Sequence, residues 1–422
     1  MNGMVRLRYL AEVNPSTPEF DKVADDQAVT FMPLETVWAD NRLDTSRSRP
    51  KAEVASGYVR FTEGDILCPK VTPTFQAGRS ALIDSLPARV GAASTEVHVV
   101  RPRPGLADSR FIRYGLLTQP FLEGGVSRFQ GVAGLQRVPD EFLKDVRLRA
   151  FGLVDQRRIA DYLDDQVARI DNIISARREQ IALIGEADRS IRARTLGGDS
   201  PTAMHQLLGP IDPSWPVRRL AEVVNRIGVG VVVNPSSYFT ESGVPFLHGG
   251  NIREGYIELN NVKHLSVRNS DLLWRSRLDA GDVVVVRAGY PGRAAVVPAE
   301  LDGANCASIL LIKPSKLAIA SWIELFFNSP QGRAQVALAQ YGAAQEQINV
   351  GDVVNFLIPV PSVQVQQAHL NRQRESTLKV RQLMAAAEKQ LVRFHEVKRS
   401  LITAAVTGGF DVSTADGSRV PV

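Results

Sequence analysis

The sequence has little cysteine and no long apolar run. Only two cysteines, Cys68 and Cys306, occur in 422 residues, and neither lies in a CxxC motif or a Cys/His cluster. This pattern excludes a Cys/His zinc site and indicates two reduced, buried thiols. No stretch reaches the ~18 consecutive apolar residues that suggest a membrane-spanning helix. The first residues, MNGMVRLRYLAEV, lack the apolar core of a signal peptide, so we expect a cytoplasmic protein without a membrane partner.

Common catalytic motifs are also missing. The sequence contains no GxxxxGK[ST] phosphate loop, no HExxH metal motif and no GxSxG nucleophile motif. The stretch NPSSY (234–238) matches only part of the Asn-Pro-Pro-aromatic motif of amino-methyltransferases, and no cofactor loop precedes it. His248, in LHGGN, is open to two interpretations, a base or ligand and an ordinary polar loop residue. These absences favour a binding protein that carries no cofactor or metal and is not an enzyme.

The composition is that of a globular protein with more than one domain. Hydrophobic residues make up 44% of the chain and charged residues 23%, and 422 residues exceed the usual size of one core. The formal net charge is +5 and the pI is about 9.2. This basic balance is compatible with a nucleic-acid partner but does not establish one.

The two halves of the chain end in nearly the same way. RSIRARTLGG (189–198) resembles RSLITAAVTGG (399–409), and an offset of 211 residues aligns Gly197 with Gly408. The same offset aligns Gln156 with Gln367, and Gln136 with Gln347. Further matches keep the same order: LRYLAEV (7–13) with VRRLAEV (217–223) at an offset of 210, EGDILC (63–68) with AGDVVV (280–285), and GRSALI (78–83) with GRAAVV (292–297). Collinear matches over such a length predict an internal duplication.

Each half begins with short apolar runs and ends with a long helical stretch. The runs, such as GDILCPKV and GDVVVVRAG, are bounded by Gly, Pro and Asp and predict strands. From Asp155 to Arg194 there is no proline, only Gly185 interrupts, and apolar residues recur at steps of three, four or seven. This stripe predicts a coiled coil, roughly 60 Å long for forty residues. We expect the two long helices to pack antiparallel; the alternative is that each folds onto its own domain.

The predicted fold class is therefore α+β, with two pseudo-repeated domains of mixed β-sheet and short helices joined by two long helices in an antiparallel coiled coil. The expected boundaries are a first domain at 1–152, a central helix at 153–198, a linker at 199–212, a second domain at 213–362, a C-terminal helix at 363–409 and a tail at 410–422.

Three stretches resemble the specificity subunits of type I restriction–modification systems. DQRRIADYLDDQVARIDNIISARREQIALI (155–184) is similar to their central helix, and IDPSWPVRRLAEV (211–223) to the opening of a target-recognition domain. GAAQEQINVGDVVNFLIPVPS (342–362) is similar to the way such a domain closes. Two departures are that the second helix lacks the Arg-Arg-Ile core of the first, and that the first half opens without the tryptophan.

The resemblance implies a non-catalytic subunit that reads a split DNA site with a fixed gap. Each domain would read one half-site of double-stranded DNA, and the helices would fix the gap. Two copies of an adenine-N6 methyltransferase subunit, which would carry S-adenosylmethionine, would dock on the chain, and a motor-nuclease subunit could join. The helix arginines Arg157, Arg158, Arg177 and Arg178 are the candidates for partner binding, although a charged helix face is usually only solvated.

Basic, amide and aromatic side chains in loops are the candidates for DNA contact, because such groups bind phosphates and base edges. In the first half they are Arg47, Arg49, Lys51, Lys70, Gln76, Arg79, Arg128, Gln130 and Arg137. In the second half they are Lys263, His264, Arg287, Tyr290, Arg293, Tyr341 and Gln345. Gln136 and Gln347 align in the repeat and could instead serve the fold. The ordinary alternative for each cation is a solvated side chain or one paired to a carboxylate.

Two other functions stay open on the sequence alone. A coiled-coil scaffold with two protein-binding domains would explain the repeat without a DNA role, but not the basic loops in both halves. An enzyme would need converging catalytic groups in each half, and His248 has no evident counterpart in the first half.

Overall fold

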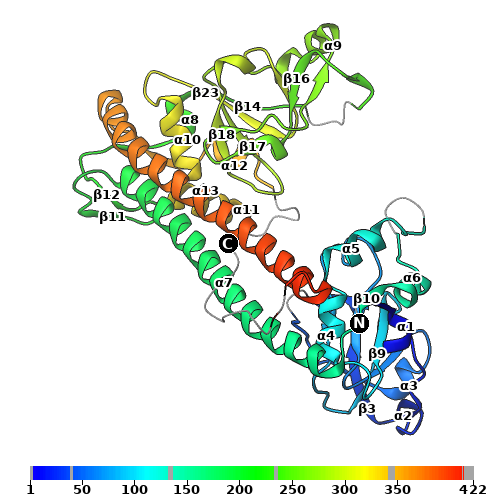
Figure 1. Cartoon of the computed structure of the whole chain (residues 1–422). Helices are drawn as coiled ribbons and strands as arrows, with labels where there is room; N and C mark the ends of the chain where they lie inside the picture. The colour runs from blue at the N-terminus through cyan, green and yellow to red at the C-terminus, as the bar shows by residue number, and fades with distance from the viewer. Residues whose placement is uncertain are drawn as a thin grey trace. The chain divides into compact units, whose positions relative to one another are not determined.

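The structure is a computed structural model that describes residues 3–38, 41–131, 136–231, 236–340, 347–410 and 412. The chain divides into two compact units. Unit 1 comprises Met1–Arg178 together with Lys389–Val422, and unit 2 comprises Glu179–Glu388. Each unit holds small sheets, short helices and part of both long helices (Figure 1).

Unit 1 contains an antiparallel sheet of four strands in the order β2-β9-β6-β7. Ile66 of β6 and Val100 of β9 are fully buried and pack beside Phe111 and Tyr114 in the main core of the unit. Burial of such branched side chains is typical of a strand with a covered face. The strands are β2 (Ala11–Val13), β9 (Val97–Pro102), β6 (Ile66–Pro69) and β7 (Ala81–Leu82).

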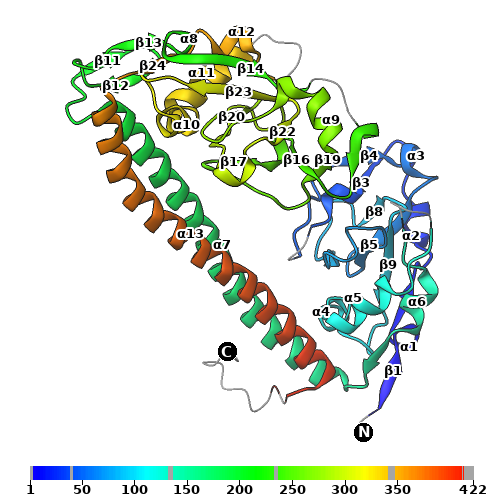
Figure 2. The same cartoon turned by 90° about the horizontal axis from the view of Figure 1, so that it is seen from above.

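A second sheet of unit 1 is mixed and has the order β4-β3-β8-β5. Strands β3 and β8 run parallel, whereas β3 with β4 and β5 with β8 run antiparallel (Figure 2). Met32 and Phe61 from this sheet share a core with Leu67 and Val99 of the first sheet. The strands are β4 (Ser48–Pro50), β3 (Ala28–Met32), β8 (Val90–Ala93) and β5 (Val59–Thr62).

A small ladder and short helices complete the domain of unit 1. Strand β1 (Met4–Arg6) pairs antiparallel with β10 (Arg147–Arg149), which lies just before the long helix. Helix α4 begins behind Asp108, whose carboxylate accepts the backbone N–H groups of residues 110 and 111. The helices are α1 (Leu7–Leu10), α2 (Pro18–Asp21), α3 (Lys51–Val54), α4 (Ser109–Gly115), α5 (Gln119–Val126), α6 (Asp140–Asp145) and the 3₁₀ helix η1 (Leu34–Thr36).

Unit 2 repeats this plan. It has an antiparallel sheet in the order β14-β23-β20-β21 and a mixed sheet in the order β15-β19-β16-β22, in which β16 and β22 run parallel. A ladder of β13 with β24 corresponds to that of β1 with β10. The strands are β13 (Val217–Arg219), β14 (Val224–Val229), β15 (Phe239–Thr240), β16 (Val244–Leu247), β17 (Ile252–Arg253), β18 (Tyr256–Ile257), β19 (Lys263–Leu265), β20 (Val283–Val286), β21 (Ala294–Val296), β22 (Asn305–Cys306), β23 (Ile309–Pro314) and β24 (Leu357–Pro359).

The short helices of unit 2 surround these sheets. Trp322 and Phe326 of α10 are fully buried and pack against Val283 of β20 and Ile312 of β23, so α10 covers the antiparallel sheet. The helices are α8 (Leu220–Val223), α9 (Val267–Leu272), α10 (Ala320–Asn328), α11 (Pro330–Gln340) and α12 (Val350–Val353), with the 3₁₀ helices η2 (Ser236–Tyr238), η3 (Gly249–Asn251), η4 (Trp274–Ser276) and η5 (Ala299–Leu301).

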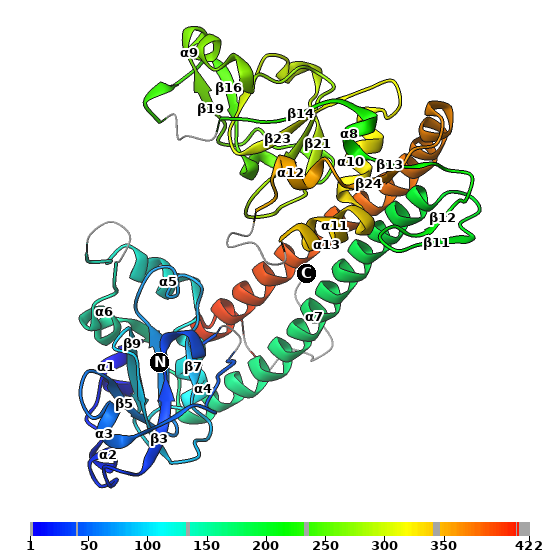
Figure 3. The same ribbon diagram turned by 180° about the vertical axis from the view of Figure 1, so that it is seen from behind.

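The two long helices pack antiparallel within each unit. In unit 1, Lys398 Nζ lies 2.7 Å from the carboxylate of Asp171. In unit 2, the Thr377 hydroxyl donates to Asp188 at 3.5 Å, so a later residue of the first helix meets an earlier residue of the second. The predicted antiparallel pairing is confirmed, and Figure 3 shows that α4 also lies against the first part of α7 in unit 1. The helices are α7 (Leu153–Gly197) and α13 (Val363–Thr407), each of 45 residues.

The ends of both helices correct the sequence alignment. Gly198 and Gly408 directly follow the helices with φ of +87° and +72°, the left-handed conformation that ends a helix at glycine. These two glycines are equivalent at an offset of 210, so the alignment of Gly197 with Gly408 is wrong by one residue.

Two buried glutamines lead to the same correction. Gln156 and Gln366 are 1% and 0% exposed, and each side-chain amide donates to two backbone carbonyls and accepts one backbone N–H. The carbonyls are those of Leu106 and Phe151 in unit 1 and of Leu317 and Pro361 in unit 2. Gln366 is therefore the counterpart of Gln156, and the alignment with exposed Gln367 is wrong.

The sequence alignment is also out of register at the opening of each half. Leu7 N donates to Val146 O at 2.8 Å, and Leu220 N donates to Phe356 O at the same distance. This equivalence sets an offset of 213 at the opening. The match of LRYLAEV with VRRLAEV at an offset of 210 is therefore out of register by three residues.

One predicted equivalence is confirmed in detail. Gly64 and Gly281 have φ of +83° and +88°, and each precedes a buried aspartate, Asp65 or Asp282. Each carboxylate accepts a backbone N–H from the residue three positions earlier in the chain. Each also pairs with a cation on the next strand, Arg101 at 2.7 Å and Lys313 at 3.3 Å respectively.

The segment 199–212, expected as a linker, contains a hairpin. Strand β11 (Ala203–His205) pairs antiparallel with β12 (Gly209–Ile211). Leu208 and Ile211 are buried, and with Trp215 they join the main core of unit 2. This segment is therefore partly a packed element of unit 2.

Replacing Gly185 in α7 with alanine is expected to raise the free energy of unfolding by about 0.5–1 kcal/mol. A Cβ there would have only ordinary contacts, 3.7 Å from the ends of Arg189 and Met384. Gly332→Ala is the opposite control, because its Cβ would lie 2.1 Å from Phe326 O, a backbone atom. Urea unfolding of both variants measures the effect; equal destabilisation by the two would contradict the expectation.

Candidate nucleic-acid interface

In unit 1 the structure brings two predicted DNA-contacting segments together. The loop between β6 and β7 carries Lys70, Gln76 and Arg79, and the chain before α6 carries Gln130 and Arg137. Val138 N donates to Lys70 O at 2.8 Å, and Gln130 and Arg137 exchange two backbone hydrogen bonds of 2.9 Å. The two segments thus form one surface at the end of the antiparallel sheet.

An apolar anchor holds the β6–β7 loop. Phe75 is 2% exposed and packs against the rings of Phe121 and Phe129 at centroid distances of 5.4 and 5.9 Å. The next residue, Gln76, is exposed. Burial of one ring therefore fixes the loop and leaves the Gln76 amide side chain exposed next to it.

Arg137 is committed to an ion pair. Its guanidinium donates to both carboxylate oxygens of Glu96 at 2.8 and 2.7 Å, and this hydrogen bonding lowers the pKa of Glu96. We call residues 136–139, just before α6, the closing segment of unit 1, and residues 347–349, just before α12, that of unit 2. The bidentate pair fixes the closing segment of unit 1 against the start of β9. By contrast, Lys70, Arg79 and Arg128 form no ion pair with any residue that the structure describes.

The buried side chain of His98 on β9 holds the closing segment of the same surface by a hydrogen bond. It is 3% exposed, its Nε2 lies 2.9 Å from Val138 O, and its Nδ1 lies 3.2 Å from the Asn14 side-chain nitrogen. A neutral ring with the proton on Nε2 satisfies both contacts, because Nε2 donates to the carbonyl and Nδ1 accepts from the amide. Burial lowers the pKa of His98 below the ordinary value of 6.5.

We expect unit 1 to lose stability as the pH falls below 6.5. The unfolded chain then takes up a proton on His98 that the folded state resists, so the loss continues down to the lower folded-state pKa. One histidine contributes at most about 1.4 kcal/mol per pH unit. Urea midpoints at pH 7.5 and 5.5 measure it. The His98→Gln variant should show a weaker pH dependence; an unchanged dependence would exclude His98 as the cause.

Unit 2 has the equivalent arrangement at its β20–β21 loop. Ile348 N donates to Arg287 O at 3.1 Å, as Val138 does to Lys70 in unit 1. The Arg287 guanidinium donates to Ile348 O at 3.1 Å and to the Asn349 side chain at 2.7 Å. Arg287 therefore fastens the closing segment to the loop.

The tip of this loop exposes an aromatic–cation pair. The Arg293 guanidinium lies 3.9 Å from the centre of the Tyr290 ring, and Tyr290 is 65% exposed. Gly289 and Gly292 have φ of +81° and +82°, so both need the left-handed region open to glycine. The turn holds an arginine and a ring in a fixed stack, a geometry suited to bases or phosphates.

Arg333, which the sequence did not single out, supports this loop. Its guanidinium donates to Pro291 O at 2.7 Å and to Glu254 at 2.9 Å. Nothing in the sequence of α11 marks it, because its partners lie 42 and 79 residues away in the chain.

His248 lies in the turn beside the same loop. A Cβ added at the next residue, Gly249, would lie 3.2 Å from Val286 and 3.9 Å from Ala288 O. His248 stacks edge-on with Phe246 at 5.1 Å, and its Nε2 has no hydrogen-bond partner among the described residues. Burial, and secondarily Lys263, lower the pKa of His248, which favours a neutral imidazole.

The other predicted DNA contacts lie on the mixed sheets. Around β4, three cations pair with carboxylates: Arg47 with Glu35 and Asp44, Arg49 with Glu53, and Lys51 with Asp25. In unit 2, Lys263 lies 4.5 Å from the centre of the Phe239 ring, and its neighbour His264 is half-buried on β19. These side chains remain predictions for DNA contact.

Tyr341 and Gln345 lie outside the described residues. Gln136 O accepts from Thr72 N at 3.0 Å, and Gln347 forms a β-bridge with Ala288, so their backbones hold the loops.

The helix arginines proposed for partner binding lie on α7. Arg157 and Arg178 are exposed, Arg177 is half-buried, and Arg158 lies 3.5 Å from Asp155 in an ion pair with both side chains 53% exposed. Such an exposed pair contributes little stability and leaves Arg158 available to a partner.

A further exposed aromatic–cation pair was missed by the sequence reasoning. Trp274 is 60% exposed, with the Arg275 guanidinium 5.3 Å from its ring centre. The pair borders a cavity of about 380 Å³ that Gly230 also lines. In the sequence this tryptophan lies in the mixed stretch SDLLWRSRLD, where no period separates an exposed ring from a buried one.

The two cysteines are free and buried, as predicted. Burial raises the pKa of Cys68 to about 12, and it raises that of Cys306 as well, so neither is a reactive thiolate. Within the described ranges, no three His, Cys, Asp or Glu residues gather as a metal site requires. Across the same ranges, every helix is too short or too polar to span a membrane.

Comparison with known proteins gives relatives of one kind. The chain is 30% identical over 156 residues to the specificity subunit of the type I restriction enzyme EcoAI of Escherichia coli, which covers 36% of this chain and 26% of that protein. It is 26% identical over 290 residues to the EcoBI specificity subunit of Escherichia coli, covering 63% of this chain and 59% of that protein. The matches therefore span 26% and 59% of the lengths of these two relatives, less than two thirds of each. No protein-family model matches it.

A solved structure has the same fold over nearly the whole chain. It comes from work on complex assembly and conformational transition of the type I R-M system. The TM-score is 0.73 with 16% sequence identity, over 97% of this chain and 98% of that chain. The likeness confirms the predicted fold class, α+β with two repeated domains and two long helices.

Proposed function

Because the chain resembles the specificity subunits of type I restriction enzymes in sequence and fold, we propose that it reads a bipartite DNA site with a fixed gap. The observation that carries this proposal is the repeated surface, a sheet loop fastened to a closing segment in both units. Each surface presents cations and amide or aromatic groups, the chemistry that reads DNA. The proposed readers are the domains at 1–152 and 213–362.

In this proposal the chain is not the catalyst. It directs two copies of an adenine-N6 methyltransferase subunit to the site, and the methyltransferase carries S-adenosylmethionine. A motor-nuclease subunit joins the complex where one is present. The helices at 153–198 and 363–409 set the gap and, through exposed arginines such as Arg157 and Arg178, contact the partners. This role places the chain in the cytoplasm with the DNA.

The test is single-molecule methylome sequencing of cells that carry this chain and the methyltransferase encoded beside it. Adenine methylation at one split motif with a fixed gap is expected, and it should vanish when the chain is deleted. Exchanging residues 1–150 for those of a relative with another site should change only one half of the motif. Methylation that persists without the chain would refute the proposal.

The salt dependence of DNA binding distinguishes the proposed function from the alternative of a protein scaffold. Binding through phosphates weakens steeply as salt rises, with a slope of about −0.9 per contact in a log–log plot. A scaffold with no DNA role would show no such site-specific binding at any salt concentration.

A further inference from the structure

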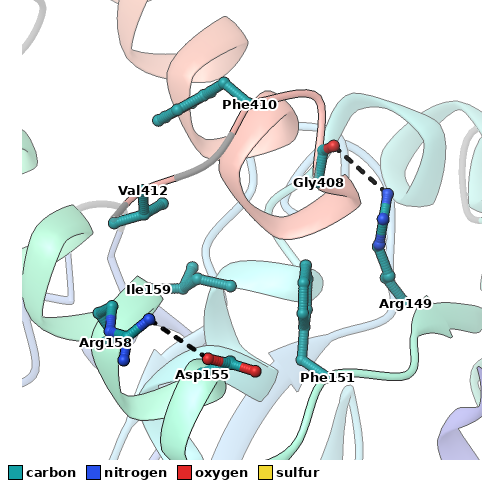
Figure 4. Close-up of a pocket in the computed structure, with 8 residues that line it drawn as sticks. All are labelled: Arg149, Phe151, Asp155, Arg158, Ile159, Gly408, Phe410 and Val412. Atoms are coloured by element: carbon teal, nitrogen blue, oxygen red, sulfur yellow. Dashed lines mark hydrogen bonds and ion pairs between the residues drawn. The ribbon is translucent and has the colours of Figure 1, made fainter. Parts of the chain in front are cut away.

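Unit 1 has an open pocket beside the start of α7. Among the described residues, four apolar side chains line it: Phe151 before the helix, Ile159 on its first turns, and Phe410 and Val412 after α13 (Figure 4). Its volume is about 350 Å³. We refer to it as the tail pocket.

The pocket is held in a fixed shape. Arg149 donates to Thr407 O at 3.1 Å and to Gly408 O at 3.3 Å, which fastens the end of α13 to the β1–β10 ladder. Phe410 stacks edge-on with Tyr162 at 5.8 Å, and Phe151 with Phe111 at 5.9 Å. These contacts between described residues hold the walls of the pocket.

The same place in unit 2 is filled by an indole ring. The counterparts of Ile159 and Phe111 are His369 and Trp322, and Trp215 stacks edge-on against both, at 5.0 and 5.8 Å. The counterpart of Gly408 is Gly198, where an added Cβ would lie 3.1 Å from the Trp215 ring. Trp215 is only 8% exposed.

The two units thus differ in what fills the position of the tail pocket. In unit 2 the chain runs on from α7 through β12 to Trp215, which closes the place from within. In unit 1 the opening of the half has no tryptophan in its sequence. The pocket that remains has the surroundings that accept an aromatic ring in unit 2.

The rim of the pocket is charged. Arg158 lies at the edge, with an exposed guanidinium 3.5 Å from Asp155 (Figure 4). Arg157, the preceding residue of α7, is exposed as well. Because the ion pair with Asp155 is exposed and long, it contributes little and is readily exchanged for another carboxylate. The rim therefore suits an acidic group next to the ring.

We propose that the tail pocket receives an aromatic side chain, adjacent to an acidic residue, from the methyltransferase subunit. The proposal rests on the proposed function and names the chemistry of its partner. Buried aromatic rings at the centre of an interface carry much of the binding free energy. The two partner sites are then unequal, since among the described residues the place that Trp215 fills in unit 2 is left as a pocket in unit 1.

Val412→Trp tests the proposal by filling the pocket from within, as Trp215 does in unit 2. The matched control is Thr202→Trp, at the equivalent position 210 residues earlier, which is exposed in a place that is already filled. The complex is co-expressed with the methyltransferase subunit, and its stoichiometry and affinity are measured by native mass spectrometry and sedimentation. Thermal unfolding shows whether each variant folds.

The expected result is that Val412→Trp weakens binding of one methyltransferase copy at least tenfold, whereas Thr202→Trp binds two copies like the wild type. Unchanged binding by a folded Val412→Trp variant would overturn the pocket proposal but leave the proposed function intact. If Val412→Trp is less stable than the wild type but still binds two copies of the methyltransferase subunit, the occupant is the tail of the chain. If Val412→Trp loses self-association, the occupant is a second copy of this chain. Either result overturns the proposal. Failure of the wild type to bind any copy would instead contradict the proposed function.

Discussion

Replacing Lys70, Arg79 and Arg128 together with alanine is expected to weaken DNA binding by the assembled complex at least about 100-fold at 50 mM salt. These cations lie on the unit 1 surface and form no ion pair with described residues. A phosphate can therefore bind them without displacing a carboxylate of the described residues. If each contacts one phosphate, the salt slope should become shallower by about 2–3. Fluorescence anisotropy on a duplex with the methylated motif, from 50 to 300 mM salt, measures both quantities.

The control for this triple variant is the equal removal of charge at Arg47, Arg49 and Lys51. Each of these cations has a carboxylate partner that a phosphate must displace, so we expect a smaller loss of affinity and of slope. If both triple variants lose the same affinity and slope, DNA senses the overall field of unit 1 and direct contact by the unpaired cations is contradicted.

Replacing Asp65 with alanine is expected to lower the free energy of unfolding of unit 1 by about 3–5 kcal/mol. The Asp65 side chain is 1% exposed and accepts two hydrogen bonds of 2.7 Å from Arg101. Its removal leaves the guanidinium, 24% exposed, without its main partner, and leaves the N–H of Thr62 without an acceptor. Hydrogen exchange of the β6 and β9 amides in increasing urea measures the change.

An exposed ion pair of the same unit serves as the control. Asp21 lies 2.6 Å from Arg60 but is 64% exposed, so Asp21→Ala should cost less than about 1 kcal/mol. Adding Arg101→Met to Asp65→Ala should recover part of the loss, because the uncompensated charge is removed. A cost below 1 kcal/mol for Asp65→Ala would show that solvent, not Asp65, satisfies Arg101.

Much of the architecture follows from local signals in the sequence. The apolar runs bounded by glycine and aspartate, as in EGDILC and AGDVVV, predict strands, and buried strands follow Asp65 and Asp282. The long helices follow from periodicity and the absence of proline. The hairpin within 199–212 was not predicted, because proline and glycine in that stretch read as a linker until Leu208 and Ile211 find a core to fill.

The register of the repeat could not be read from identity alone. LAEV occurs in both halves and matches well, yet hydrogen bonds to Val146 and Phe356 align Leu7 with Leu220. Two adjacent glutamines, Gln366 and Gln367, fit the alignment equally until one of them is seen to be buried. Such choices depend on which side chain faces the core, and that is a property of tertiary packing.

For the candidate interface, the sequence located the loops but not the state of each side chain. Arg137 and Arg287 lie in the predicted loops, but their guanidinium groups form hydrogen bonds that hold the closing segments in place. Whether a loop arginine has a carboxylate partner depends on residues tens of positions away, as with Glu96. The exposed pair of Trp274 and Arg275 was missed for another reason, because no periodicity in SDLLWRSRLD distinguishes an exposed ring from a buried one.

The equal length of the two long helices has a consequence for the history of the chain. Between the halves the offset is 213 at Leu7, 217 at Asp65 and 214 at Gly78, but from Val138 to Gly198 it stays at 210. Insertions and deletions have thus accumulated among the strands and loops, while the closing segment and the helices have kept their length in both halves. One extra residue in a helix turns every following side chain by about 100° about the axis. The loops can therefore change length independently, whereas the helices can only change length together.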